Sequence, residues 1–496
     1  MSKSPVIGSI IEKSGTELIV STLPLLANSK PLRHTLLQSI QKYILSARTP
    51  ISTSFTRPPG VIEDRAEFSS AIWHTADRIL EHNLSRPVLR SIARNLVSGT
   101  VIEGTQKIAI SQFHETYGTN PPNFLVLSPG KTCNLHCTGC YANAGENSEK
   151  LDWDIFDRII TEAKTLWGIR FLVISGGEPL AYRSEGKGIL DAAEKHPDVF
   201  FLMYTNGTLV NDEVAKRLAE LGNVTPAFSV EGWRDRTDER RGQGVYDKVL
   251  DAMGRLRSAG VPFGISLTAT RNNIEEIFSD EFIDFFFEKQ GALYTWLFHY
   301  MPIGRSFTLN LMPTPKQRVW MWKRVWEIIR DRHIFIADFW NHGTLVDGCL
   351  AAGRSGGYFY IDWNGAVSPC VFVPYSPVNI REIYASGGNL NDVWSNPFFT
   401  DIRKWQENYR KNNGNWLAPC IIRDNYRDLR GMMTQYEPEP TDENAKKALL
   451  DPDYARGMES YDLAYKALAD PLWQKYYLHP NGQGKSHDRP LPENQV

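Results

Sequence analysis

Between residues 123 and 300 the sequence alternates short apolar runs with stretches of helical periodicity. The apolar runs are 123–129, 171–175, 199–205, 226–230, 263–269 and 293–300. Apolar residues at helical spacing lie between them, in 152–168, 186–195, 211–221, 245–259 and 273–289. Six strands that alternate with helices predict a parallel sheet of the α/β class with right-handed crossovers. Since a closed barrel needs eight such units, we expect a partial (β/α)6 barrel.

Composition sets few further limits. The 496 residues are enough for two or three domains, and contents of 42% hydrophobic and 23% charged residues are ordinary for a globular protein. A net charge of −2 gives no general affinity for nucleic acid. No apolar run approaches the ~18 residues of a spanning helix, and the N-terminus lacks the pattern of a secretory signal. We therefore expect a cytoplasmic protein.

The unusual residues follow the predicted strands. A loop with three cysteines comes after the first strand, "SGGEP" (175–179) after the second and "TNG" (205–207) after the third. "SVEG" (229–232) follows the fourth strand, and "TDERRG" (237–242) comes shortly afterwards. In folds of this kind, ligands bind at the carboxyl ends of the strands. We expect these segments to form one site on one rim.

The loop "KTCNLHCTGCYANAG" (131–145) carries Cys133, Cys137 and Cys140. Three thiolates could hold three irons of a 4Fe–4S cluster and leave the fourth iron open to another ligand. A zinc site would need His136 or a distant residue to complete the tetrahedron. The spacing of the cysteines leaves both interpretations open.

"CNLHCTGCY" resembles the CxxxCxxC signature of radical S-adenosylmethionine (radical SAM) enzymes, including the aromatic residue, Tyr141, after the third cysteine. "SGGEP" resembles the Gly-Gly-Glu element of the same family. The resemblance covers about residues 121–310. It implies that the cysteines bind a 4Fe–4S cluster whose open iron takes the amino and carboxylate groups of S-adenosyl-L-methionine. It also implies that the segment Gly176, Gly177, Glu178 and Pro179 receives the ammonium group of that cofactor.

The resemblance extends to weaker elements on the same rim. "FSVEG" is similar to a Ser-x-Asp-Gly element, with Glu231 in place of the aspartate, and implies that Ser229 and Glu231 contact the cofactor. "DERRG" resembles an Asp-x-x-Arg-Gly stretch, so Arg241 is the candidate partner of the cofactor carboxylate. Alternatively, the two arginines are a solvated pair. Thr205 and Asn206 face the ribose or simply form a turn.

A second triplet consists of Cys349, Cys370 and Cys420. The first two flank a predicted hairpin, "YFYIDWNGAVSPC", and the arrangement resembles the auxiliary-cluster regions called SPASM and twitch domains. The resemblance implies a second 4Fe–4S cluster, although the sequence has fewer cysteines than those domains. Two alternatives stay open: a cluster with one iron not ligated by cysteine, or buried cysteines without a cluster.

The fourth ligand of such a cluster is not evident. Asp424 and His342 are conceivable ligands, but both residue types are more often ordinary surface. Arg423 stands where a fourth cysteine would be expected.

These predictions divide the chain into five parts. We expect a helical N-terminal extension (1–120), the radical SAM partial barrel (121–310), a connecting helix and strand (311–340), a small SPASM/twitch-like auxiliary-cluster domain (341–430), and a linker with a C-terminal tail (431–496). The segment 18–62 is basic and includes an amphipathic stretch. Such a helix packs on a domain, or it contacts a membrane surface peripherally.

The family resemblance also implies a reaction. An electron donor such as flavodoxin or ferredoxin reduces the cluster, S-adenosylmethionine is cleaved, and the resulting 5′-deoxyadenosyl radical takes a hydrogen atom from an unactivated C–H bond. For the substrate we expect a lipid or hydrophobic small molecule. The alternatives are maturation of a ribosomally made peptide and, from another class, a non-catalytic iron–sulfur or zinc scaffold.

Overall fold

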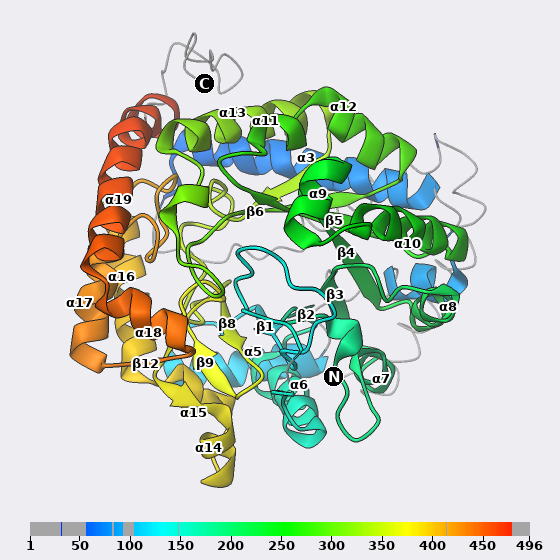
Figure 1. Ribbon diagram of the computed structural model, residues 1–496. Helices are drawn as coiled ribbons and strands as arrows, with labels where there is room; N and C mark the ends of the chain where they lie inside the picture. The colour runs from blue at the N-terminus through cyan, green and yellow to red at the C-terminus, as the bar shows by residue number, and fades with distance from the viewer. Residues whose placement is uncertain are drawn as a thin grey trace.

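The computed structural model of the chain (Figure 1) describes residues 31, 56–81, 84–92, 104–146, 148–412 and 414–478. Its centre is a ten-stranded sheet in the order β11-β9-β8-β1-β2-β3-β4-β5-β6-β7. The strands predicted from the sequence are β1 (Phe124–Leu127), β2 (Phe171–Ile174), β3 (Phe200–Thr205), β4 (Val224–Val230), β5 (Gly264–Ala269) and β6 (Tyr294–His299). These six are parallel and adjacent in chain order, which confirms the partial barrel.

Helices cover the outer side of this curved sheet (Figure 1). They are α6 (Trp153–Trp167), α7 (Ile189–Lys195), α8 (Asp212–Leu221) and α10 (Val245–Ala259). Helix α9 (Arg234–Arg241), which follows β4, lies at the rim instead. The periodicity explains their orientation, since α6 buries Phe156, Ile159 and Ile160 on one face. Gly168 ends this helix in the left-handed conformation, with φ of 68°.

The single helix predicted over 273–289 is wrong. The structure has α11 (Ile274–Ile277), α12 (Asp280–Ile283) and the π-helix η2 (Asp284–Lys289). The side chain of Ser279 accepts a hydrogen bond from the backbone of Phe282, and it therefore caps the start of a new helix. The apolar spacing continues across the break, so periodicity alone did not reveal it.

A seventh parallel strand extends the barrel beyond the predicted six. Helix α13 (Pro315–Arg332) leads to β7 (Phe335–Asp338), which pairs with β6. Thr314 and Gln317 form a reciprocal capping box at the start of α13. The short 3₁₀ turn η3 (Leu309–Leu311) lies between β6 and α13, and another, η1 (Pro179–Ala181), follows β2.

The C-terminal region joins the other edge of the same sheet. Strand β8 (Tyr358–Ile361) pairs in parallel with β1, and the predicted hairpin then turns into β9 (Ala366–Ser368). β11 (Val378–Asn379) pairs with β9, and a separate small ladder joins β10 (Tyr375–Ser376) to β12 (Glu439–Pro440). The two cysteine regions therefore belong to one continuous sheet.

Helices complete the C-terminal region, and Figure 1 shows them along one side of the barrel. They are α14 (Ile380–Ala385), α15 (Leu390–Trp394), α16 (Pro397–Lys411), α17 (Tyr426–Tyr436), α18 (Glu443–Leu450), α19 (Pro452–Trp473) and the π-helix η4 (Gln474–Leu478). The stretch after residue 431, expected to be a linker, differs from that expectation. Helix α19 buries Tyr454, Tyr465 and Trp473 and packs against α13, because its apolar residues recur at helical spacing among the charged ones.

In the N-terminal extension, α3 (Pro59–Glu81) and α5 (Gly104–Tyr117) are described. Helix α3 packs against α13 and β7, and α5 packs against α6. Most of the basic segment 18–62, residue 31 aside, lies outside the described residues up to position 55. Among the helices of the described part, none is long and apolar enough to cross a membrane.

Candidate active site

The first cysteine triplet lies in the loop between β1 and α6. The three thiols are half-buried and line one cavity of about 400 Å³ inside the rim of the barrel. The loop is tied to itself, since the backbone N–H of Cys133 donates to the carbonyl of Gly145 at 2.8 Å and that of Asn143 donates to Cys140 at 3.1 Å. The loop thus presents its thiols from a fixed backbone.

The glycine pair after β2 lets this loop approach the sheet. Gly176 has φ of 117°, which favours glycine. A Cβ on Gly177 would lie 2.1 Å from the carbonyl oxygen of Thr132. The backbone N–H of Gly177 donates to Gly130 at 2.9 Å, so the loop and the strand end are joined directly. Both glycines line the cavity.

Glu178 makes hydrogen bonds with two other residues of the same rim. Its carboxylate is buried and does not line the cavity. It accepts hydrogen bonds from the Thr205 hydroxyl at 2.7 Å and the Asn206 backbone at 2.8 Å. Burial raises the pKa of Glu178 above its ordinary value, although these donors oppose the shift. In this structure Glu178 holds Thr205 and Asn206 in place, and those two residues line the cavity.

Glu231 and the two arginines of "DERRG" form an ion-pair cluster. Glu231 is buried and contacts Arg240 and Arg241, with the Arg241 Nε at 2.9 Å. Burial alone would lower the pKa of Arg241, but the charges of Glu231 and of Cys137 and Cys140 raise it overall. One carboxylate between two guanidinium groups leaves positive charge beside the cysteine loop. The solvated-pair alternative is wrong, since both side chains are mostly buried and paired with the buried Glu231.

The cluster also holds the cysteine loop. The backbone N–H of Thr138 donates to the carbonyl of Arg240 at 2.9 Å, and the Arg240 Nε donates to the carbonyl of Thr138 at 3.1 Å. This reciprocal pair of bonds docks α9 on the segment between the second and third cysteines. Ser229, at the end of β4, lines the cavity nearby.

Arg305 is a site residue that sequence reasoning missed. It follows β6, and its guanidinium donates to the carbonyls of Cys137, at 2.5 Å, and Ala144. Its backbone N–H donates to the carbonyl of Cys140 at 2.9 Å. Arg305 therefore clamps the loop through backbone oxygens, which have no sequence signature. The one available signal was a Gly-Arg pair just past the sixth strand.

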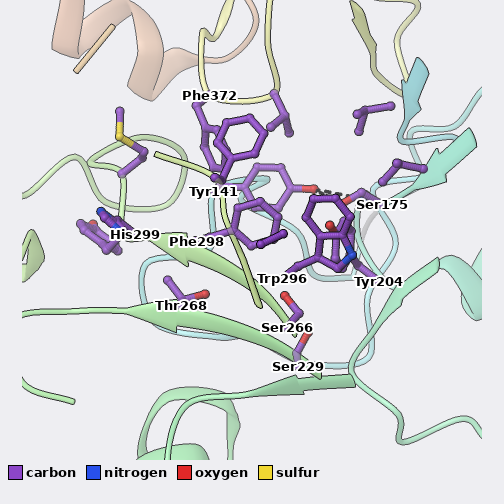
Figure 2. Close-up of a pocket in the computed structure, with 18 of the residues that line it drawn as sticks. Tyr141, Ser175, Tyr204, Ser229, Ser266, Thr268, Trp296, Phe298, His299 and Phe372 are labelled. Carbon is purple, nitrogen blue, oxygen red and sulfur yellow. Dashed lines mark hydrogen bonds between the residues drawn. The ribbon is translucent and has the colours of Figure 1, made fainter. Parts of the chain in front are cut away.

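Tyr141 connects the cysteine loop to the end of β2. Its hydroxyl makes a hydrogen bond with the Ser175 hydroxyl, drawn dashed in Figure 2, and accepts the backbone N–H of Gly176 at 3.2 Å. Burial raises the pKa of Tyr141. The ring lies in the cavity wall, 6.3 Å from that of Phe372.

Aromatic side chains make up most of the remaining wall. Figure 2 shows Trp296 and Phe298, both from β6, opposite Phe372 and beside Tyr204. Ser266 and Thr268 from β5 add hydroxyls to the wall, and that of Ser266 lies next to Ser229. The β5 surface of the cavity is therefore partly polar. The cavity has polar groups near the cysteines and strand ends and a broad aromatic surface elsewhere.

The second triplet converges on its own small cavity. Cys349, Cys370 and Cys420 all line a space of about 30 Å³, walled by Ile421, Ile422 and other apolar side chains. The Tyr358 hydroxyl lies 2.9 Å from the Cys370 sulfur. Burial raises the pKa of Cys370 to about 12.

The two conceivable extra ligands are not at the surface, and that expectation is wrong. Asp424 is fully buried and paired with Arg318, whose Nη2 lies 3.1 Å from Oδ2. His342 is buried as well, but it lines the larger cavity rather than the small one. Within the described ranges, no three His, Cys, Asp or Glu side chains gather around a point that would suit a single metal ion.

Family models match the chain where the two triplets lie. The model of the radical SAM superfamily matches residues 127–280. A model described as an iron–sulfur cluster-binding domain, SPASM, matches residues 349–421. This chain is a radical SAM enzyme. The first domain implies a 4Fe–4S cluster and S-adenosylmethionine as its cofactors, and the second implies an auxiliary iron–sulfur centre.

Several named proteins are similar to this radical SAM enzyme. It is 26% identical over 310 residues to an AdoMet-dependent heme synthase of Methanosarcina barkeri, across 56% of this chain and 83% of the relative. It is 28% identical over 310 residues to the mycofactocin maturase MftC of Mycobacterium ulcerans, across 60% and 80%. The solved structure of Streptococcus suis SuiB bound to the precursor peptide SuiA has 19% identity and a TM-score of 0.49, across 63% and 72%.

The residues of the radical SAM site fit its cofactors. Three half-buried thiols line a cavity that also holds the glycine pair and the cationic Arg241. The donor chemistry of the second triplet also fits an iron–sulfur centre. Its cavity of about 30 Å³ is narrow, however, with room for about one water molecule.

Proposed function

We propose that this radical SAM enzyme removes a hydrogen atom from an unactivated C–H bond of a ribosomally made peptide. The observation that carries the proposal is the cavity itself, which joins the cysteine loop to an aromatic chamber. The peptide part is supported by the names of relatives, which include mycofactocin maturase and the sporulation killing factor maturation protein SkfB of Bacillus subtilis. A lipid substrate has no support from the relatives named here.

The roles of the polar residues follow from their places. Cys133, Cys137 and Cys140 would hold the 4Fe–4S cluster, which supplies the electron for cleavage of S-adenosylmethionine. Arg241 would supply a positive charge for the cofactor carboxylate. Thr205 and Asn206, fixed by Glu178, would orient the ribose. Tyr141, Gly176, Gly177 and Ser229 would complete the cofactor surface. Pro179 is buried and does not line the cavity.

The aromatic walls suit the chemistry of a carbon radical. Trp296, Phe298 and Phe372 exclude water from the chamber. The indole N–H of Trp296 is the one polar hydrogen that these three side chains carry. A cavity of about 400 Å³ is near the lower end of the range for small-molecule sites. S-adenosylmethionine would fill much of that space. What remains suits one side chain of a peptide better than a whole tetrapyrrole.

The auxiliary centre would act as an electron acceptor for the substrate radical. Phe339, Leu350 and Tyr358 line both the large cavity and the cavity of the second triplet. Tyr358 also contacts Cys370. A single layer of side chains thus separates the chamber from Cys349, Cys370 and Cys420, which suits electron transfer between them.

The test begins with anaerobic reconstitution of the full chain and analysis of iron and sulfide. Reduction by dithionite, or by flavodoxin or ferredoxin as the expected donor, should then yield 5′-deoxyadenosine. Co-expression with short peptides encoded beside the gene, followed by mass spectrometry, tests the substrate. A peptide whose mass falls by two hydrogens would support the proposal. Abundant zinc without deoxyadenosine would favour a scaffold protein, and turnover of a coproporphyrin would replace the peptide with a tetrapyrrole.

A further inference from the structure

A buried acidic residue between two histidines forms one end of the large cavity. His299 ends β6, Asp338 ends β7, and His342 lies in the following turn. All three are buried and line the cavity. Figure 2 shows His299 at the end away from Ser175 and Tyr204. The roles proposed above for the cysteine loop and the cofactor surface use none of the three.

Asp338 determines which nitrogen of each ring carries the proton. The His299 Nε2 lies 3.1 Å from the Asp338 carboxylate, so this nitrogen holds the hydrogen and donates it. The backbone N–H of Asp338 donates to the His342 Nδ1 at 3.1 Å, so the hydrogen of that ring is on Nε2. Burial lowers the pKa of each histidine to about 4, and both rings are neutral at pH 7.

Each ring is left with one unsatisfied buried nitrogen. Among the described residues, neither the His299 Nδ1 nor the His342 Nε2 has a hydrogen-bond partner. The surroundings are aromatic: Trp340 stacks on His299 at 5.3 Å, and Trp326 lies 4.9 Å from the ring of His342. Buried polar atoms in native proteins are normally paired. The first nitrogen is an acceptor and the second is a donor, and their partners are therefore expected to come from a ligand.

We propose that His299 and His342 form a substrate subsite that binds a neutral carboxamide. The amide N–H would donate to the His299 Nδ1, and the amide oxygen would accept from the His342 Nε2. A carboxylate has no hydrogen to give His299, and an apolar group leaves both nitrogens unpaired. The inference rests on the proposed function in one respect, because a peptide supplies carboxamide groups in its backbone and in Asn and Gln side chains.

Titration calorimetry of the full chain with small aromatic probes tests the subsite. Benzamide carries a carboxamide, benzyl alcohol a hydroxyl and toluene no polar group. Benzamide should bind at least about tenfold more tightly than toluene, as expected for buried hydrogen bonds. In His299→Phe and His342→Phe, which keep an aromatic ring in place, this preference should fall to about one.

A matched pair of aspartate variants sharpens the test. Asp338→Asn presents an amide to the His299 Nε2 and should move the ring hydrogen to Nδ1, so that the preference for benzamide is lost. Asp157→Asn is the control, because Asp157 holds the His196 Nε2 at 2.9 Å and neither residue lines the cavity. The control should keep the full preference. If Asp338→Asn does not fold, the two phenylalanine variants decide.

Two results would overturn the subsite. One is wild-type affinity for benzamide no greater than that for toluene or benzyl alcohol. The other is an unchanged preference in both phenylalanine variants. Binding of the probes does not depend on cleavage of S-adenosylmethionine, so the subsite and the proposed function can fail separately. A benzamide preference without deoxyadenosine formation would refute the proposed function alone, and deoxyadenosine formation without the preference would refute the subsite alone.

Discussion

The first cysteine triplet lies within one loop, whereas the second is assembled from three separate segments of the chain. The first presents half-buried thiols to a cavity of about 400 Å³. The second encloses about 30 Å³ between Cys349, Cys370 and Cys420. The first triplet therefore lies beside an open cavity and the second beside a narrow one, although Cys349 and Cys420 are half-buried like the first three thiols.

In both regions, nevertheless, an arginine side chain holds the backbone of a cysteine segment. Arg305 donates to the carbonyls of Cys137 and Ala144 in the first loop. Arg354 donates in the same way to the carbonyls of Cys349 and Val346. A guanidinium fork can bind several carbonyls at once and so fixes a segment that has no regular hydrogen bonding. The two regions therefore differ in the volume of the cavity beside the thiols rather than in the way the backbone is held.

The largest effect should come from removing one triplet at a time. Replacing Cys133, Cys137 and Cys140 together by alanine should abolish 5′-deoxyadenosine formation, because those irons would have no other ligands, while iron at the second triplet remains. Cys370→Ala should instead lower the iron content by about four per chain and damage product formation more than cofactor cleavage. Iron analysis and chromatography measure both. Deoxyadenosine from the triple variant would refute the assignment.

The order of cluster insertion should differ between the sites. Folded apo-protein should take up about four irons per chain at the open triplet, and about eight only after partial unfolding in denaturant and refolding with iron and sulfide. The reason is the narrow second cavity, in which burial also disfavours the thiolate of Cys370. Cys370→Ala provides the control, since it should show no second step. Rapid uptake of eight irons by the folded chain would contradict this comparison.

The arginine clamps should have selective effects. Arg305→Met removes charge-assisted bonds worth about 1.5–3 kcal/mol each, and it should speed the loss of iron from the first site to a chelator by roughly tenfold or more. Arg354→Met should do the same at the second site only. The two variants serve as controls for each other. Equal iron loss from both sites in either variant would indicate general destabilisation rather than a local clamp.

The smallest effect should be that of Glu178→Gln. The carboxylate receives the Thr205 hydroxyl and the Asn206 backbone, so a glutamine NH₂ would face a donor. We expect weaker S-adenosylmethionine binding by about 1–3 kcal/mol, measured by calorimetry. Thr205→Val should give a similar loss if Glu178 acts through that residue. A loss in Glu178→Gln without one in Thr205→Val would favour direct contact between Glu178 and the cofactor ammonium.

Local patterns in the sequence were enough to predict part of the molecule. Apolar runs marked β1 to β6, and the resemblance placed most of the cofactor residues on one rim, because each lies within a few positions of a strand end. Contacts between distant segments were not predictable in this way. The pairing of β8 with β1, the clamp by Arg305 and the histidines around Asp338 depend on side chains that meet only in the folded chain. Asp424 looked like a surface residue because its partner, Arg318, is far away in the sequence.

The pairing of β8 with β1 has a consequence for synthesis of the chain. Phe124 pairs with Tyr358, which is made 234 residues later. At about 5–20 residues per second, one edge of the nascent barrel stays open on the ribosome for roughly 10 to 50 seconds. An unpaired edge strand is a template for wrong partners. During that interval a chaperone that covers β1 would protect the enzyme, and the emerging cysteine segments would still be free to meet the cell's cluster-delivery proteins.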